Sequence, residues 1–313
     1  MNDAEGVASA TREQVMAAAR ELSYRPSRAA KSLAQRSPRT VTVAVPTFTT
    51  PFHNELLKGV RDQLEDIEVD LLLCDLDRDN PEHTLRDFLS RGMIDGLLVV
   101  GVTIKGSLAD ELDRTERPVV LVGGDRSTVD SFYWNDEHGA KQATKHLLEH
   151  CHAPVGMITA PSSGRVEARR IRGYRSAIES NDQSFSSSLV VETCSSTHNG
   201  HSEEAGYEAM QELLRVNPSV SGIFASSDVQ AMGAWRALRD SGRQVPEDCA
   251  LVGYDDIKTS QYVGLSSVSQ GMKSVGYDAT DLLLRRMNGW GGAPASTRVR
   301  PQLQVRRSSS VAG

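Results

Sequence analysis

Short apolar runs of the strand type alternate with amphipathic helical segments along most of this chain, and this alternation restricts the fold more than any other feature. In the first half the runs are rich in Val and Leu, and they lie at residues 41–46, 69–74, 96–102 and 118–123. Strands that are buried on both faces, with helices between them, are typical of a parallel sheet covered on both sides. We therefore predict an α/β unit that is complete by about residue 136.

The alternation then restarts, which predicts a second unit of the same kind. Strands are expected at residues 155–160, 188–193, 220–225 and 250–254, with helical segments between them. Two such units in tandem imply a cleft, and ligands of parallel sheets bind outside the carboxyl ends of the strands. The residues that directly follow the strands are therefore the candidates for a binding site.

The length agrees with this division, because 313 residues are about twice the usual length of a domain. No apolar run approaches the roughly 20 residues of a membrane span, and no apolar signal segment follows the N-terminus. We expect a cytoplasmic protein without membrane contact. Its four cysteines stand at long spacings, which is typical of reduced, packed thiols rather than of disulfides or a zinc site.

The charge balance changes near residue 40. Residues 1–40 hold seven Lys and Arg against four Asp and Glu, whereas the rest of the chain holds 28 against 37. The basic stretch at residues 25–40 contains no acid and follows a short amphipathic helix expected at residues 11–24. Such a stretch on an otherwise acidic protein is expected of a segment that contacts phosphate, although composition alone also allows a solvated linker.

Motifs of catalysis and of metal binding are weak in this sequence. No expected strand is followed by a glycine-rich nucleotide loop, no Gly-x-Ser-x-Gly turn is present, and no two carboxylates form an evident acid and base pair. His146 and His150 are four residues apart on an expected helix, but no Glu or Asp between them has the position that it has in a zinc hydrolase motif. We expect neither an enzyme nor a bound metal or cofactor.

Polar side chains near the strand ends of the second unit are candidates for holding a small metabolite. They are Arg170, Ser227, Asp255 and Gln270, with Phe52, Phe224 and Tyr254 as candidates for a flat apolar wall. Sugars and small metabolites are usually bound by such a mixture, in which buried polar groups stay unpaired if the wrong ligand enters. The spacing equally allows Arg170 and Asp255 to be members of structural ion pairs and the aromatic rings to be core residues.

Several segments resemble the LacI (lactose-repressor) family of bacterial transcription regulators, in the order of that family. The run TREQVMAAARELSYRPSRAAKSLAQRSPRTVTVAVP is similar to its third helix, hinge helix and first core strand, and SDVQAMGAWRALRDSGRQVPEDCALVGYDD is the most diagnostic later segment. Shorter matches are PFHNELLKGV, DGLLVV, RPVVLVGGDR, NDEHGAKQATKHLLEHCH, RRIRGY and SSVSQ. The resemblance implies an α/β fold with a periplasmic-binding-protein-like core, in which two doubly wound parallel-sheet subdomains are joined by three crossovers.

The same resemblance implies the domain boundaries. We expect a partial helical headpiece at 1–24, a hinge helix at 25–40, a core N-subdomain at 41–137 plus 269–294, and an effector-binding core C-subdomain at 138–268 plus 295–313. The first two helices of the family's helix-turn-helix have no counterpart before the third. Operator DNA binding through the hinge is therefore expected to be compromised.

The resemblance also assigns residues to two sites. Tyr24, Arg25, Ser27, Ala29, Ala30 and Leu33 match DNA-binding positions of the hinge region, with Leu33 as the wedge between base steps of the minor groove. Phe52, His53, Arg170, Phe224, Ser227, Asp255 and Gln270 fall on positions that line the family's effector cleft. Ser227 stands where the family often has Asn, which leaves the identity of the effector open.

These expectations describe a homodimeric, effector-responsive transcription regulator, most simply a repressor, that binds a sugar or related metabolite between its subdomains. The ligand would favour one arrangement of the subdomains and so change how the paired hinge segments meet DNA. Two alternatives stay open from the sequence. One is a sugar-binding protein of a transport system, which shares the core but requires export, and the other is a truncated regulator that binds effector without reading an operator.

Overall fold

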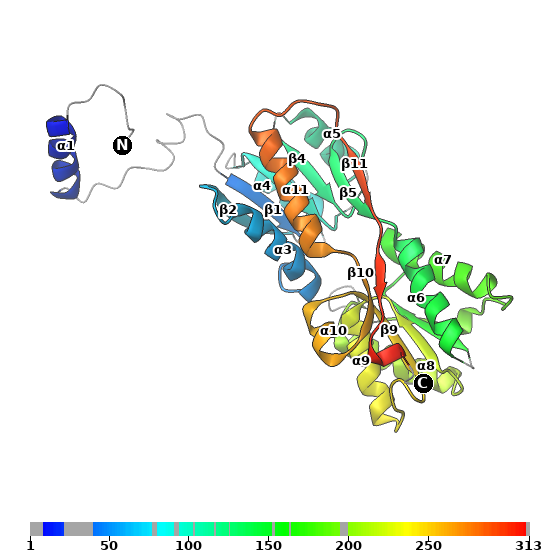
Figure 1. Cartoon of the computed structure of the whole chain (residues 1–313). Coiled ribbons are helices and arrows are strands. Elements are labelled where there is room, and N and C mark those ends of the chain that lie inside the picture. Colours follow the sequence, from blue (N-terminus) through cyan, green and yellow to red (C-terminus); the bar gives the residue numbers. More distant parts are fainter. Residues whose placement is uncertain are drawn as a thin grey trace.

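The computed structural model describes residues 9–21, 40–76, 80–90, 94–102, 104–115, 117–124, 126–151, 154–162, 164–194 and 200–310. Residues 40–310 form two six-stranded sheets, one in each half of the core, with helices on both faces of each sheet (Figure 1). The predicted α/β class with two parallel-dominated sheets is confirmed. The helix α1 (Ser9–Glu21) precedes the core.

The first sheet is parallel throughout. In spatial order its strands are β11 (Ser296–Val299), β5 (Asp130–Trp134), β4 (Val119–Val122), β3 (Gly96–Val100), β1 (Thr40–Val45) and β2 (Asp70–Asp75). Side chains of β1, β3 and β4 are buried on both faces, which explains why their sequences are nearly continuous apolar runs. β2 lies at one edge and exposes part of its apolar sequence.

Four helices cover the first sheet. The helices α3 (Pro51–Leu64) and α11 (Met272–Met287) pack against one face, and α4 (Pro81–Ser90) and α5 (Gly106–Arg114) pack against the other. Thr50 caps α3, because its hydroxyl accepts a hydrogen bond from the backbone N–H of His53, and a proline occupies the first turn. This cap fixes the first turn of α3 and with it the side chains that the sequence assigns to the effector cleft.

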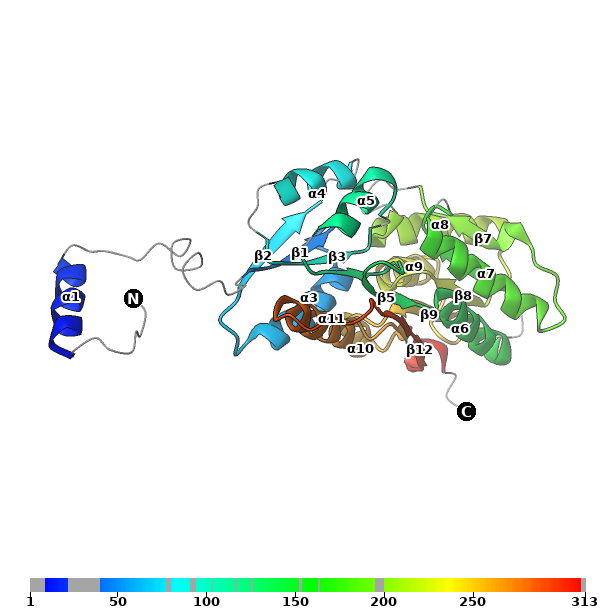
Figure 2. The same cartoon turned by 90° about the horizontal axis from the view of Figure 1, so that it is seen from above.

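The second sheet repeats the arrangement. Its strands, in spatial order, are β12 (Gln302–Gln304), β10 (Ser266–Ser269), β9 (Ala250–Asp255), β8 (Gly222–Ala225), β6 (Val155–Thr159) and β7 (Val190–Glu192), and only β12 among them runs antiparallel to its neighbour. The helices α6 (Asp136–His150) and α7 (Arg165–Glu179) cover one face, and α8 (Glu203–Val216) and α9 (Asp228–Asp240) cover the other (Figure 2). The short helix α10 (Lys258–Val263) connects β9 to β10.

The chain passes between the two sheets three times, after β5, after β10 and after β11. The last passage corrects an expected boundary, because residues 296–299 pair with β5 in the first sheet rather than belonging to the C-subdomain. The pairing is reinforced by side chains: the hydroxyls of Ser131 and Ser296 lie 2.9 Å apart, and the N–H of Ala295 donates to Asp130 at 2.9 Å. The C-subdomain therefore resumes only after β11.

Among the described residues, no helix combines the length and apolar character that crossing a bilayer requires. The hinge positions Tyr24, Arg25, Ser27, Ala29, Ala30 and Leu33 lie outside the described residues.

Glycines allow α3 and α11 to approach closely. A Cβ atom on Gly59 would lie 1.9 Å from the carbonyl oxygen of Lys273, and one on Gly276 would lie 2.2 Å from that of Leu56. Both obstacles are backbone atoms, so they cannot move aside without separating the helices. The absence of side chains at these two positions therefore allows the short distance between α3 and α11.

We expect Gly59→Ala to lower the free energy of unfolding by about 2–3 kcal/mol, because the added methyl group overpacks a contact between two backbones. Urea denaturation measures the change. Gly291→Ala is the matched control, since a Cβ at that position meets no atom within 4 Å. Equal stability of the two variants would contradict the role given to this helix contact.

Candidate functional site

Polar residues gather where neighbouring strands of the second sheet end. β8 is followed by Ser226 and Ser227, β9 ends at Asp255, and β10 is followed by Gln270. β8, β9 and β10 are parallel neighbours, so these residues meet at one edge although they are far apart in the sequence. Ser227 caps α9 by accepting a hydrogen bond from the N–H of Gln230, which fixes its hydroxyl at this edge.

The guanidinium group of Arg170, on α7, is held from three sides. Its Nε and Nη2 atoms lie 3.2 Å from Oδ1 of Asp136, and its Nη1 donates to the carbonyl oxygen of Ser226 at 2.5 Å. Its central carbon lies 3.7 Å from the centroid of the Tyr254 ring. Arg170 and Asp136 are only 5 % and 3 % exposed, so the pair is shielded from water.

The charge of Arg170 is maintained despite its burial. Burial disfavours the protonated guanidinium, but the neighbouring Asp136, followed by Tyr254 and Asp255, outweighs this effect and holds the pKa of Arg170 above its ordinary value. The group is therefore a permanent, pre-oriented cation whose charge is already balanced by a carboxylate. It can position a ligand through hydrogen bonds, but it offers little net charge to an anion.

A second pair is formed by Asp255 and Gln270, in which Nε2 of Gln270 donates to Oδ1 of Asp255 at 2.7 Å. Burial raises the pKa of Asp255 well above its ordinary value, and the charge of Arg170 opposes part of that rise. Asp255 has a φ of +108° and Asp256 a φ of +53°, which are costly conformations for residues other than glycine. Backbone strain of this kind is concentrated at binding and catalytic sites.

An aromatic group from the first subdomain lies at the crossovers. The rings of Phe52 and His53, in the first turn of α3, lie edge to face with centroids 5.2 Å apart, and Phe52 lies edge to face with Trp134 at 6.4 Å. Nε1 of Trp134 donates to the carbonyl oxygen of Gln270 at 2.7 Å. The aromatic group is therefore hydrogen-bonded to Gln270, which also holds Asp255, and it links both subdomains at the site.

The structure thus brings together six of the seven residues that the sequence assigns to the effector cleft. Phe52, His53, Arg170, Ser227, Asp255 and Gln270 lie around the strand ends and the crossovers. Phe224 and Tyr254, expected to form an apolar wall, are fully buried instead and pack against α6 and α7 with their ring centroids 6.3 Å apart. Both lie within strands that helices cover on each face, and Arg170 shields the ring of Tyr254.

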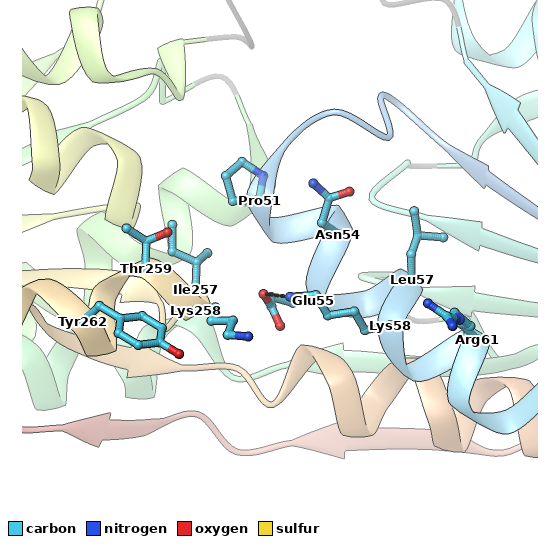
Figure 3. Close-up of a pocket in the computed structure, with 10 residues that line it drawn as sticks. All are labelled: Pro51, Asn54, Glu55, Leu57, Lys58, Arg61, Ile257, Lys258, Thr259 and Tyr262. Atoms are coloured by element: carbon cyan, nitrogen blue, oxygen red, sulfur yellow. Dashed lines mark hydrogen bonds and ion pairs between the residues drawn. The ribbon is translucent and has the colours of Figure 1, made fainter.

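A groove with a volume of about 620 Å³ lies on the outside of the molecule between the two subdomains. It is lined by Asn54, Lys58 and Arg61 of α3 and by Lys258, Thr259 and Tyr262 of α10 (Figure 3). Lys58 is paired with Glu55 at 2.5 Å within the groove. None of the six residues at the strand ends lines it, so the groove is a second feature that shares helix α3 with the first.

Comparison with known proteins places the chain in a family. Residues 144–309 match the model of a periplasmic binding protein-like domain. The chain is 31 % identical to the HTH-type transcriptional regulator CelR of Thermobifida fusca, over 98 % of this chain and 92 % of that protein. It is 30 % identical to the HTH-type transcriptional repressor PurR of Aliivibrio fischeri (strain MJ11), with the same coverage. The chain belongs to the LacI family of transcriptional regulators.

Solved structures of LacI-family proteins share the fold. A complex of CelR with cellobiose has a TM-score of 0.75 and 29 % sequence identity, over 97 % of this chain and 92 % of that chain. A LacI-family regulator from Enterococcus faecium with bound ribose also has a TM-score of 0.75, with 26 % identity over 86 % and 98 % of the two chains. The lac repressor dimer bound to operator has a TM-score of 0.82, and at 22 % identity it supports the fold alone.

This LacI-family chain is a transcription regulator and not an enzyme, as its relatives are regulators of transcription. Its site contains two residues that the sequence did not single out, Trp134 and Asp136. They stand at the end of β5 and the start of α6, on either side of a crossover. The signal that could have found them is the strand β5 itself, whose carboxyl end leads directly into the first crossover.

We expect Asp136→Ala to lower the free energy of unfolding by about 3–5 kcal/mol, since it leaves the buried Arg170 cation without its carboxylate. Glu137→Ala is the matched control: Glu137 also pairs across α6 and α7, with Arg172 at 3.4 Å, but both side chains are exposed. Its cost should stay below about 1 kcal/mol. Chemical denaturation measures both, and similar costs would show that burial of the Arg170 pair is not decisive.

Proposed function

We propose that this regulator binds a neutral, hydroxyl-rich metabolite of the sugar class at Phe52, His53, Arg170, Ser227, Asp255 and Gln270. The observation that supports this is the coupling of Arg170 to Asp136 and of Gln270 to Asp255, which leaves carboxylate and amide groups oriented but no unbalanced cation among these residues. Carboxylates and planar amides bind pairs of sugar hydroxyls, and a strained, pre-oriented carboxylate reduces the entropy lost on binding. CelR and the Enterococcus faecium regulator were solved with cellobiose and ribose.

The expected role of Phe224 is modified in this proposal. Since Phe224 is fully buried within β8, the apolar surface against the ligand is assigned to the partly buried ring of Phe52, which packs on Trp134 at the crossovers. An aromatic face on one subdomain and polar groups on the other mean that a ligand bound to both favours one relative arrangement of the subdomains. The ligand can shift that arrangement only by its difference in affinity for the two states.

The DNA-binding function is assigned to the segment before the core. We propose that Tyr24, Arg25 and Ser27 contact phosphates, and that Ala29 and Ala30 allow the close approach through which Leu33 enters the minor groove. These residues precede β1 directly, so a rearrangement of the first subdomain alters where two such segments meet. The protein would act in the cytoplasm as a repressor whose affinity for DNA depends on the metabolite.

We expect isothermal titration calorimetry with cellobiose, D-ribose and guanine to detect binding of a sugar at one site per chain. Asp255→Asn should weaken that binding by about 30-fold or more, because it replaces one of the two carboxyl oxygens of the site by an amide donor. Asp240→Asn on the surface of α9 is the control and should bind as the natural chain does. Binding of guanine alone would overturn the sugar class, and no binding of any of the three would remove the support for an effector site here.

We further propose that two copies pair through the flank that carries β2, α3 and α10 (Figure 1). Leu71 and Leu73 are exposed on β2, which is an edge strand, and Tyr262 on α10 is 79 % exposed. Exposed apolar side chains on an edge strand are a typical association surface, and a soluble chain would otherwise be prone to aggregate there. A two-fold axis that runs along the long direction of the molecule at this flank would bring the starts of both β1 strands to the same end of the dimer.

Tyr262→Asp is expected to raise the dissociation constant of the dimer by about 100-fold, because it places a charge in the pairing surface. Sedimentation equilibrium of the full chain measures this constant. Val216→Asp, an exposed apolar residue at the end of α8, is the control and should leave it unchanged. A stable Tyr262→Asp dimer would move the pairing surface elsewhere.

A further inference from the structure

A buried carboxylate outside the effector residues connects three segments of the second subdomain. Asp228, the first residue of α9, is fully buried. Its Oδ1 accepts a hydrogen bond from the hydroxyl of Ser267 at 2.6 Å, and its Oδ2 accepts one from the hydroxyl of Ser260 at 2.6 Å and one from the N–H of Ile257 at 2.9 Å. Ser267 lies on β10, Ser260 lies on α10, and Ile257 lies between β9 and α10.

The same network holds the strained turn after β9. The hydroxyl of Ser267 accepts a hydrogen bond from the N–H of Asp256 at 2.9 Å, and the carboxylate of Asp256 accepts one from Arg306 at 2.6 Å. Asp255 and Asp256, the two residues of this turn with positive φ, are followed by Ile257, whose N–H donates to Asp228, and the N–H of Asp256 itself donates to Ser267. Such conformations persist only where the surroundings determine them fully, and here Asp228 contributes together with Gln270 and Arg306.

The fold reserves space for this carboxylate. A Cβ atom on Gly253, in β9, would lie 2.2 Å from Oδ1 of Asp228. Burial raises the pKa of Asp228 to about 7, although the hydrogen bonds from Ser260, Ser267 and Ile257 oppose this rise. An apolar residue of the same volume would avoid the free-energy cost of burying a carboxylate, so packing alone does not explain Asp228 at this position.

Asp228 lies between two surfaces with different assignments. Next to it in the sequence is Ser227, and through Ile257 and Ser267 it fixes the turn that presents Asp255 toward Gln270. Through Ser260 it holds α10, whose Tyr262 projects from the outer flank. The carboxylate therefore connects the effector residues to the flank that borders the groove through hydrogen bonds.

We propose that Asp228 is a positioning residue that joins the Asp255 turn and α10 into one rigid body, so that effector occupancy is transmitted to the subunit-pairing flank. This inference rests on the proposed effector site and pairing flank. The mechanism requires no contact between Asp228 and the ligand. A ligand that binds Asp255 and shifts its turn also shifts α10, because the two form one rigid body. The position of α10 relative to α3 then changes, and with it the groove between these helices.

Hydrogen–deuterium exchange of the full chain, followed in overlapping peptides, tests the rigid body without any ligand. Asp228→Asn keeps the shape of the side chain but replaces an acceptor by a donor, and Ser267→Ala removes one hydroxyl from the network. Both should raise exchange in residues 255–257 and 258–263 together, by about tenfold or more. The control is Tyr174→Phe, which removes another single buried hydrogen bond of this subdomain, from the Tyr174 hydroxyl to the carbonyl of Val155.

Faster exchange in both segments in the two test variants, but not in the control, supports the proposal. Faster exchange at residues 255–257 alone, at neither segment, or equally in the control overturns it. Sedimentation equilibrium of the same variants tests the step from α10 to subunit pairing: a dimer dissociation constant raised about tenfold supports it, and an unchanged constant beside a loosened α10 overturns it. Because neither readout uses a sugar, failure of the calorimetric test of the effector site remains a separate result.

Discussion

The buried ion pair of Arg170 and Asp136 is the interaction on which the geometry of the site depends. It joins α6 to α7, and through the carbonyl of Ser226 and the ring of Tyr254 it fixes both helices to the ends of β8 and β9. Replacing a buried ion pair by apolar residues is often neutral for stability, so its value here lies in orientation. The guanidinium group of Arg170 is fixed in place, and Asp136 balances its charge, so the pair as a whole is neutral. This suits hydrogen bonding to a neutral ligand.

Gln270 connects the site to the relative movement of the two subdomains. Its side chain holds Asp255 in the second subdomain, while its carbonyl accepts a hydrogen bond from Trp134 in the first, and it lies on one of the three passages between them. A rotation of one subdomain against the other therefore changes the surroundings of a residue that a ligand would touch. Binding and subdomain arrangement are coupled at this point by direct hydrogen bonds rather than through a long path.

The sequence predicts the two parallel sheets because strands buried on both faces are continuous apolar runs. It misses β5, β10, β11 and β12, since these short strands include polar residues such as Asp130, Ser267, Ser296 and Gln302. Tertiary partners accommodate such groups, as Arg286 does for the carboxylate of Asp130. The same continuity limits what the sequence can say of Phe224, because a run without alternation does not reveal which side chain faces a ligand. The sequence locates polar residues after the strands more reliably than apolar residues within them, because residues that follow parallel strands converge on one edge whatever the details of packing.

The arrangement of α3 and α10 makes control of DNA binding by a small molecule physically reasonable. α3 carries Phe52 and His53 in its first turn and lines the outer groove with Asn54 and Lys58, and α10 follows Asp255 closely and lines the opposite wall with Tyr262. Each helix therefore has one part at the effector residues and another at the pairing flank. A ligand that changes the separation of these two helices alters both sites at once. With a symmetric partner on that flank, the same rearrangement occurs in both chains where they contact DNA.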